Sequence, residues 1–221
     1  MRDARDETAD VGVSPGTWAI LPAVLLVPAF CLLFLDNVWA EGFLFGGTKP
    51  AATEYYYVEP SWWFAPIVLG LGTVLAVVGM RLRSVLRSWG DRSGLPDVAG
   101  AGALLAGPSA VLAAMLGLVA ALDDYLPYET NHLDETLYLV VILLWTYPLT
   151  VGIGLMCAAA VWSLHEHGQI GSVRTGLGTA AALVAVLSPL TLLLPVAMGG
   201  VAFVGQAGCL AWIIAIPRER R

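Results

Sequence analysis

The chain has 221 residues, of which 58% are hydrophobic and 13% are charged, and its mean hydropathy is +0.76. Because a soluble domain carries about 25% charged residues, this composition excludes an ordinary soluble fold and indicates an all-α integral membrane protein. The formal net charge of −6 leaves no basic surface that could neutralise a run of phosphates, so nucleic acid is excluded as a partner.

The charged residues are confined to short stretches, and the apolar runs between them are long enough for transmembrane helices. A helix needs about 20 residues to cross the hydrocarbon core of a bilayer. After an N-terminal tail at 1–16, four runs meet this length. They lie at about 17–35, 62–80, 98–122 and 137–162.

The last apolar tract is too long for one helix. No charged residue lies between Arg174 and Arg218, which leaves 43 positions. At about 1.5 Å per residue, such a helix is about twice as long as the ~30 Å hydrocarbon core. Pro195 lies near the middle, where a helix breaker would allow a turn. We therefore expect two spans that form a tight hairpin turning near Leu194–Ala197, namely 175–194 and 196–216.

These six spans make one transmembrane domain at 17–216, followed by a short tail at 217–221. The distribution of basic residues favours this count over five spans. With six spans, only Lys49 lies on one side of the membrane, and ten arginines lie on the other: Arg2, Arg5, Arg81, Arg83, Arg87, Arg92, Arg174, Arg218, Arg220 and Arg221. With a single long fifth span, the three C-terminal arginines would change sides, which leaves seven basic residues on one side of the membrane and four on the other. Since basic loops stay inside, both termini are expected in the cytoplasm and the protein in the cell membrane.

The third span is rich in small residues at four-residue spacing, such as Gly102 with Ala106 and Ala103 with Gly107. Small residues let helix backbones approach closely, which drives association where lipid offers no hydrophobic gain. We therefore expect this span to be central in the bundle.

A short basic segment, "RLRSVLRSW" at 81–89, continues the second span. Its apolar residues, Leu82, Val85, Leu86 and Trp89, share one helical face. The arginines point elsewhere, and such a helix favours the interface and anionic headgroups. Arg81, Arg83 and Arg87 are thus expected to form a lipid-facing basic anchor.

The loop between the third and fourth spans is strongly acidic and has no basic residue. Oxygen-rich clusters suit calcium or magnesium. The metal-ligand candidates here are Asp123, Asp124, Glu129, His132, Asp134 and Glu135. Their spacing matches no established metal loop, so a hydrated acidic exterior is the simpler interpretation. Ten arginines against one lysine, with a pI near 4.9, also resemble the composition of proteins from salt-loving archaea, and high-GC bacteria are the competing source.

No other pattern indicates a reaction or a cofactor. None of the six spans contains Asp, Glu, Lys, Arg or His, the residues that mark ion paths and proton relays in membranes. "HEHGQ" at 165–169 has Gln169 where a zinc-protease motif needs its second histidine. Cys31, Cys157 and Cys209 all lie in apolar runs, so no disulfide is expected.

These observations favour a non-catalytic membrane subunit or accessory that works through its helix surfaces. Its partners would be the lipid bilayer and either other membrane subunits or further copies of itself. Two alternatives remain: a passive or weakly coupled carrier of a small solute, and an enzyme that uses the outer acidic loop. A cavity lined by Thr146, Thr150, Ser188 or Gln206 would favour the carrier, whereas a dry core would favour the subunit.

Overall fold

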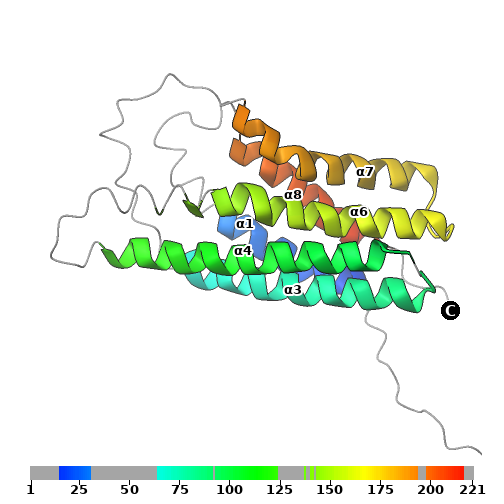
Figure 1. Cartoon of the computed structure of the whole chain (residues 1–221), viewed down its shortest axis with the longest axis horizontal. Helices are drawn as coiled ribbons and strands as arrows, with labels where there is room; N and C mark the ends of the chain where they lie inside the picture. Colours follow the sequence, from blue (N-terminus) through cyan, green and yellow to red (C-terminus); the bar gives the residue numbers. More distant parts are fainter. Residues whose placement is uncertain are drawn as a thin grey trace, which may run out of the picture.

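The computed structural model describes residues 15–30, 64–91, 93–123, 143–193 and 198–216, together with 137, 140 and 141. Every element in these ranges is helical (Figure 1). The α-helices are α1 (Pro15–Phe30), α3 (Phe64–Ser88), α4 (Leu95–Asp123), α6 (Thr150–Glu166), α7 (Ser172–Leu187) and α8 (Met198–Ile214). A π-helical turn, η2 (Trp145–Leu149), precedes α6, and a 3₁₀ segment, η3 (Ser188–Leu193), follows α7.

Four helical stretches are long and apolar enough to cross a membrane, which confirms the expected class of helical membrane protein. They are Phe64–Ser88, Leu95–Val119, Trp145–Glu166 and Ser172–Leu190. Two shorter apolar stretches, Ile20–Ala29 and Gly200–Ile214, lie within the first and last expected spans. The tails expected at 1–16 and 217–221 fall almost wholly outside the described residues.

The helices form a closed bundle in which each packs against its neighbours in the chain (Figure 1). Contacts run from α1 to α3, then to α4, α6, α7 and α8, and from α8 back to α1. Helix α6 also contacts α8, and it is the most buried of the four long helices.

The expectation that the third span is central is therefore wrong. Helix α4 packs mainly on α3 and α6, and its other side is open, with Leu104 67% exposed and Met115 60% exposed. Small residues bring α4 very close to its two neighbours, but close approach on one side does not require enclosure on all sides.

Glycine pairs set this close approach. A Cβ atom added to Gly102 would lie 2.6 Å from the carbonyl oxygen of Gly152 on α6, and a Cβ added to Gly152 would lie 2.6 Å from that of Gly102. Between α3 and α4, a Cβ on Gly72 would lie 2.7 Å from the carbonyl oxygen of Gly107. The backbones of these helices are in direct contact, and the separation between the helices is so small that only glycine fits at these positions.

The last apolar tract is two helices rather than one. Helices α7 and α8 pack side by side and run in opposite directions, and residues 194–197 between them lie outside the described part (Figure 1). The α-helical part of α7 ends at Leu187, just before Ser188 and Pro189. Proline has no backbone N–H to donate to a helical hydrogen bond, and it disfavours the α-helical conformation in the residue before it. The helix therefore tightens into η3. Near the other end of the pair, the Trp212 indole donates a hydrogen bond to the Arg174 carbonyl at 2.9 Å.

Candidate functional site

The most polar part of the described bundle interior surrounds η2, the π-helical turn that leads into α6. Pro148 lies inside the π-helical turn η2. A proline inside a helix removes one backbone donor, and a π turn shifts the neighbouring carbonyls off the regular α-helical ladder. In a membrane, such carbonyls need partners from side chains or from other helices.

Side chains from three elements supply these partners. The Trp145 carbonyl accepts a hydrogen bond from the Thr150 hydroxyl at 3.0 Å and one from the Gln206 amide at 3.3 Å. The same Gln206 amide nitrogen donates to the Thr150 oxygen at 2.6 Å. One residue further on, the Thr146 carbonyl accepts a hydrogen bond from the Ser188 hydroxyl at 3.2 Å. The π-helical turn η2 is thereby bonded to α8 and to the end of α7.

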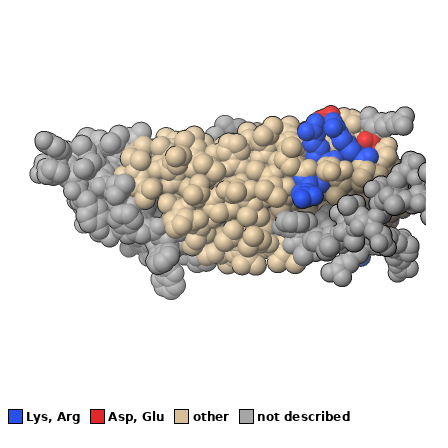
Figure 2. Space-filling view, turned by 90° about the horizontal axis from the view of Figure 1, so that it is seen from below, with Lys and Arg blue, Asp and Glu red and all other residues tan. Residues whose placement is uncertain are grey.

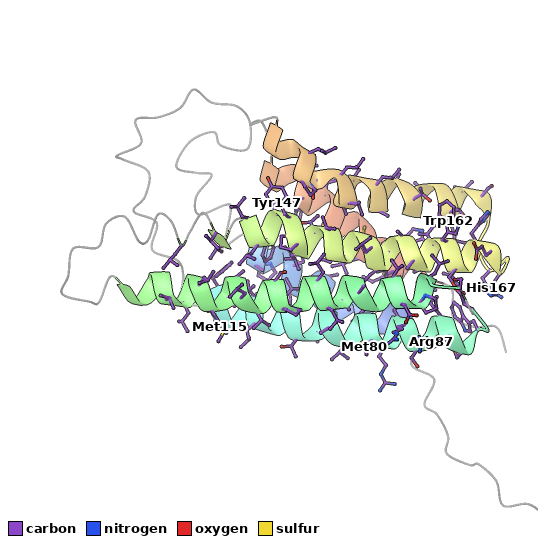
Figure 3. The ribbon with its side chains drawn as sticks, in the orientation of Figure 1. Met80, Arg87, Met115, Tyr147, Trp162 and His167 are labelled. Atoms are coloured by element: carbon purple, nitrogen blue, oxygen red, sulfur yellow. The ribbon has the colours of Figure 1, made fainter. Side chains whose placement is uncertain are left out.

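This polar cluster is packed rather than open. Trp145, Thr146, Thr150, Ser188 and Gln206 are each at most 1% exposed. Two of their polar atoms, the Trp145 indole nitrogen and the Gln206 amide oxygen, are buried without a hydrogen-bond partner. Figure 3 shows neighbouring Tyr147 toward the end of the bundle opposite Arg87 and His167.

The four polar side chains proposed as the lining of a solute cavity are thus brought together. Thr150 and Ser188 donate hydrogen bonds to the backbone of η2, and Gln206 donates one to Thr150. Sequence reasoning missed Trp145, the centre of the cluster, because its backbone carbonyl rather than its side chain accepts the bonds. Pro148 with Thr150 two residues later was the available signal, since a proline frees carbonyls that a nearby hydroxyl can reach.

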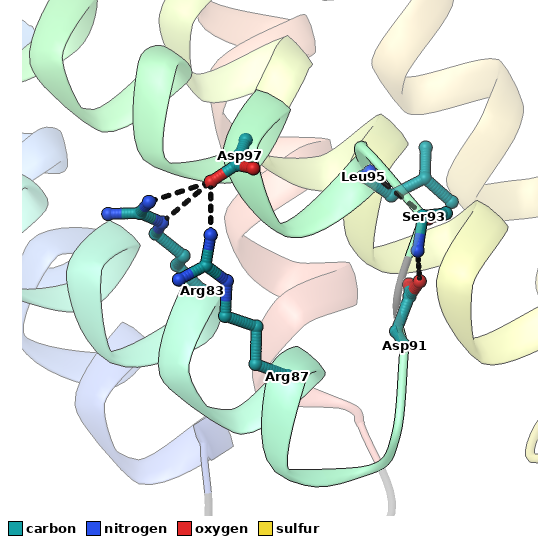
Figure 4. Close-up of polar contacts among 6 residues, drawn as sticks. All are labelled: Arg83, Arg87, Asp91, Ser93, Leu95 and Asp97. Atoms are coloured by element: carbon teal, nitrogen blue, oxygen red, sulfur yellow. Dashed lines mark hydrogen bonds and ion pairs between the residues drawn. The ribbon is translucent and has the colours of Figure 1, made fainter.

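The second polar region lies at the opposite end of the bundle, where α3 meets α4. One oxygen of Asp97, in the first turn of α4, accepts hydrogen bonds from Arg83 at 2.7 and 3.0 Å and from Arg87 at 2.7 Å (Figure 4). All three side chains are at least one-third exposed, with values of 34%, 53% and 56% for Arg83, Arg87 and Asp97. Exposed ion pairs of this kind contribute little to stability, so the contact mainly orients the start of α4.

The amphipathic face expected in the basic segment is present. Leu82 and Leu86 are buried, Val85 and Trp89 are half-buried, and α3 runs without interruption to Ser88. Two of the three arginines assigned to the lipid anchor are turned toward Asp97, while Arg81 is exposed. Contact of these arginines with lipid stays a prediction.

Asp91 is the only buried charged residue in the described part of the chain, and it lies in the turn between α3 and α4. One oxygen accepts a hydrogen bond from the Ser93 backbone at 2.8 Å. The other oxygen and the nearby Ser163 hydroxyl make no hydrogen bond of regular geometry. Burial opposes ionisation of this carboxyl, but the Ser163 and Ser93 hydroxyls, the Ser93 N–H and the charge on His167 together hold its pKa below the ordinary value of 3.8.

We expect Asp91→Asn to lower the thermal midpoint near neutral pH, with a difference that disappears in acid. A carboxyl whose pKa is lower in the folded state adds stability above its unfolded pKa and loses it as the pH falls through the folded value. Unfolding midpoints in detergent, measured for both proteins from pH 7 to below 3.8, test this. A gap that widens as the pH falls would contradict it.

The metal-ligand candidates of the acidic loop are not tested. Asp123 is the last residue of α4, and Asp124, Glu129, His132, Asp134 and Glu135 lie outside the described residues. Within the described part, no three His, Cys, Asp or Glu side chains are grouped so that they could hold a metal ion. His165 and His167 contact Thr175 and the Ser163 carbonyl at 3.2 and 2.7 Å.

Cys157 and Cys209 are both free and buried, as expected, while Cys31 lies outside the described part.

No known protein-family model, curated protein or solved structure matches this chain. The function therefore has to be argued from the two polar regions and from the surface of the bundle.

Proposed function

We propose that the chain is a six-span protein of the cell membrane with both termini in the cytoplasm. The distribution of basic residues, with ten expected on one side of the membrane and one on the other, supports this orientation. The bundle is consistent with it, because Arg81, Arg83 and Arg87 near the end of α3 lie at the same end as Arg174 at the start of α7 (Figure 1). Figure 2 shows basic side chains, with acidic ones beside them, gathered at one end of a face whose remaining described part is uncharged.

Reporter fusions test this orientation. Green fluorescent protein attached after Arg221 or inserted at Gly168 should fluoresce, because it folds in the cytoplasm and not after export. Alkaline phosphatase inserted after Lys49 should be active, because it needs an exported position. The opposite pattern at Arg221 and Lys49 would reverse the topology, and mismatched signals at Arg221 and Gly168 would contradict the count of six spans.

Within that membrane, we propose a non-catalytic subunit or accessory that acts through its helix surfaces. The observation that carries this proposal is the chemistry of the described interior. Apart from Asp91 in the turn between α3 and α4, its polar side chains are neutral, and the cluster around η2 contains hydrogen bonds among its own side chains and to the backbone. A relay of protons or ions through the bundle would call for titratable groups along the path.

Helix α7 offers the surface best suited to a protein partner. It is the least buried of the four long helices. Leu177 is 65% exposed and Leu183 52% exposed, and both are on the same helix as Gly176 and Ala180, which are exposed and small. Exposed small residues four positions apart let a second helix approach closely.

Extraction of the protein from native membranes in mild detergent, followed by native mass spectrometry, tests this proposal. The wild type should retain a protein partner or a second copy, and Gly176→Leu with Ala180→Leu should release it. A Cβ atom at Gly176 meets nothing within 4 Å, so this variant should still fold. Ala101→Leu, at another exposed small residue, is the matched control. A wild type that is monomeric and without a partner would overturn the proposal.

One observation favours the carrier as a second candidate. The Trp145 indole nitrogen and the Gln206 amide oxygen are unpaired beside a π-helical turn, and π-helical turns within helices often occur at functional sites. If the protein is a carrier, reconstituted vesicles should take up a small solute in proportion to protein, and Gln206→Leu should change that uptake. Vesicles no more permeable than protein-free vesicles to a panel of small neutral solutes would remove this alternative.

A further inference from the structure

Two buried cysteines, Cys157 on α6 and Cys209 on α8, are placed side by side by the way both helices pack against α7. A Cβ atom on Gly154, three residues before Cys157, would lie 2.9 Å from the Ala185 Cβ of α7. A Cβ atom on Gly205, four residues before Cys209, would lie 2.8 Å from the Ala185 Cα. Helices α6 and α8 therefore both reach the same residue of α7, one turn before each cysteine.

Gly178, about two turns earlier on α7, makes the corresponding contacts on the other side of the pair. A Cβ atom on Gly178 would meet the side chains of Val161 on α6 and Trp212 on α8. Residues three and four apart share one face of a helix. Cys157 and Cys209 therefore lie on the faces of α6 and α8 that α7 covers.

The two thiols contact each other and α7. Their side chains are within hydrogen-bonding distance of each other, and the Cys157 thiol also donates to the Gly178 carbonyl at 3.8 Å. Both cysteines are 0% exposed. A disulfide has an S–S distance of about 2.05 Å, so joining two thiols that are already in contact requires only a small shift of α6 against α8.

Helix α7 controls access to this pair. Thiols buried in apolar surroundings are inert, so the pair can react only while α7 is displaced. Helix α7 is the least buried of the four long helices. Segments with little buried surface open more readily than the rest of a fold, which makes α7 the cover most easily displaced.

We propose that Cys157 and Cys209 are a redox pair, oxidised to a disulfide between α6 and α8 when α7 moves away. The oxidant is a lipid hydroperoxide, which forms within the bilayer and reaches the pair without a water-filled path. One sulfur attacks the hydroperoxide, the O–O bond breaks, and the lipid leaves as an alcohol with the thiol proton. The second sulfur then displaces water from the resulting sulfenic acid. Two thiols and one hydroperoxide thus give one disulfide, one alcohol and one water.

The test treats the purified full chain in lipid nanodiscs with cumene hydroperoxide, an apolar organic hydroperoxide. The remaining thiols are blocked, and the chain is unfolded and cleaved with trypsin at Arg92, Arg174 and Arg218. This places the two cysteines in separate fragments, 93–174 and 175–218. Mass spectrometry should find these fragments joined after oxidation and separate once the sample is reduced.

Four variants examine the pair and its cover. Cys157→Ser and Cys209→Ser should each abolish the joined product. Gly178→Ala pushes α7 away from its neighbours and should form the product about tenfold faster, the lower part of the range for overpacked interiors. Gly176→Ala is the matched control on the same helix and should react at the wild-type rate, since its new Cβ meets nothing within 4 Å.

The rates are compared below the unfolding midpoint of every variant, so that a faster reaction reports displacement of α7 and not loss of the fold. Absence of the joined product in the wild type and in Gly178→Ala would overturn the proposal. So would a product linked through Cys31 instead, or a Gly178→Ala rate no higher than that of Gly176→Ala. The proposal rests on the membrane location given above. The reaction is measured on the isolated chain, so its failure would leave the proposed protein partner unaffected.

Discussion

Replacing Gly152 with alanine should destabilise the bundle by about 3 kcal/mol, the upper part of the range for overpacked interiors. The added Cβ atom would lie 2.6 Å from the Gly102 carbonyl oxygen, 2.7 Å from the Ala106 nitrogen and 2.8 Å from the Ala106 Cβ. Two of these three atoms belong to the backbone of α4, so no side chain can rotate away to make room. The helices α4 and α6 would have to separate.

The measurement is the free energy of unfolding in mixed micelles, titrated with a denaturing detergent. Gly176→Ala is the control, since it makes the same chemical change in a helix where the new Cβ meets nothing within 4 Å. Alanine also favours a helix over glycine by about 1 kcal/mol, so the control should be neutral or slightly more stable. If both variants match the wild type, the backbone contact between α4 and α6 is not as close as the structure has it.

This pair of glycines shows what the sequence could and could not predict. The four-residue spacing of small residues in 98–122 correctly predicted that this helix approaches its neighbours closely. It could not show that Gly102 meets Gly152, because the contact depends on how two helices face each other. Nor could it show that α6 rather than α4 is the most enclosed helix. Lipid is as apolar as leucine, so a lipid-facing side and a helix-facing side of a span have similar composition.

The four long apolar helices and the two shorter ones could be predicted from the sequence, because hydropathy and charge are local properties of the chain. The break in the last apolar tract followed from its length and from its prolines. Helix α3 continues to Ser88, as the amphipathic pattern of 81–89 predicted, but the pairing of Arg83 and Arg87 with Asp97 was not predicted.

The polar cluster was predicted only in part. Thr146, Thr150, Ser188 and Gln206 stood out because few polar side chains lie in the spans at all. Their assembly depends on carbonyls that Pro148 and the π-helical turn expose, and a backbone conformation of this kind leaves no residue pattern of its own.

Replacing Gln206 with leucine should destabilise the protein by about 1 kcal/mol, a typical value for hydrogen bonds between transmembrane helices. The amide donates to the Trp145 carbonyl and to the Thr150 hydroxyl, and leucine fills a similar volume without either bond. The loss stays modest for two reasons. Thr150 continues to donate to the Trp145 carbonyl, and the amide oxygen that is removed has no partner in the wild type.

A double-mutant cycle with Thr150→Val separates this bond from general packing. Gln206 also donates directly to Thr150, so each single variant already removes that bond, and the double variant should lose less than the sum of the single losses. Ser188→Ala is the control. It removes the neighbouring hydrogen bond to the Thr146 carbonyl, and Ser188 does not donate to the Trp145 carbonyl in the bonds described above. Additive losses for Gln206 and Thr150 would show that they act independently. If Gln206→Leu raises the free energy of unfolding instead, the wild-type amide destabilises the bundle. That result is expected of a group that binds a solute, and not of one that holds helices together.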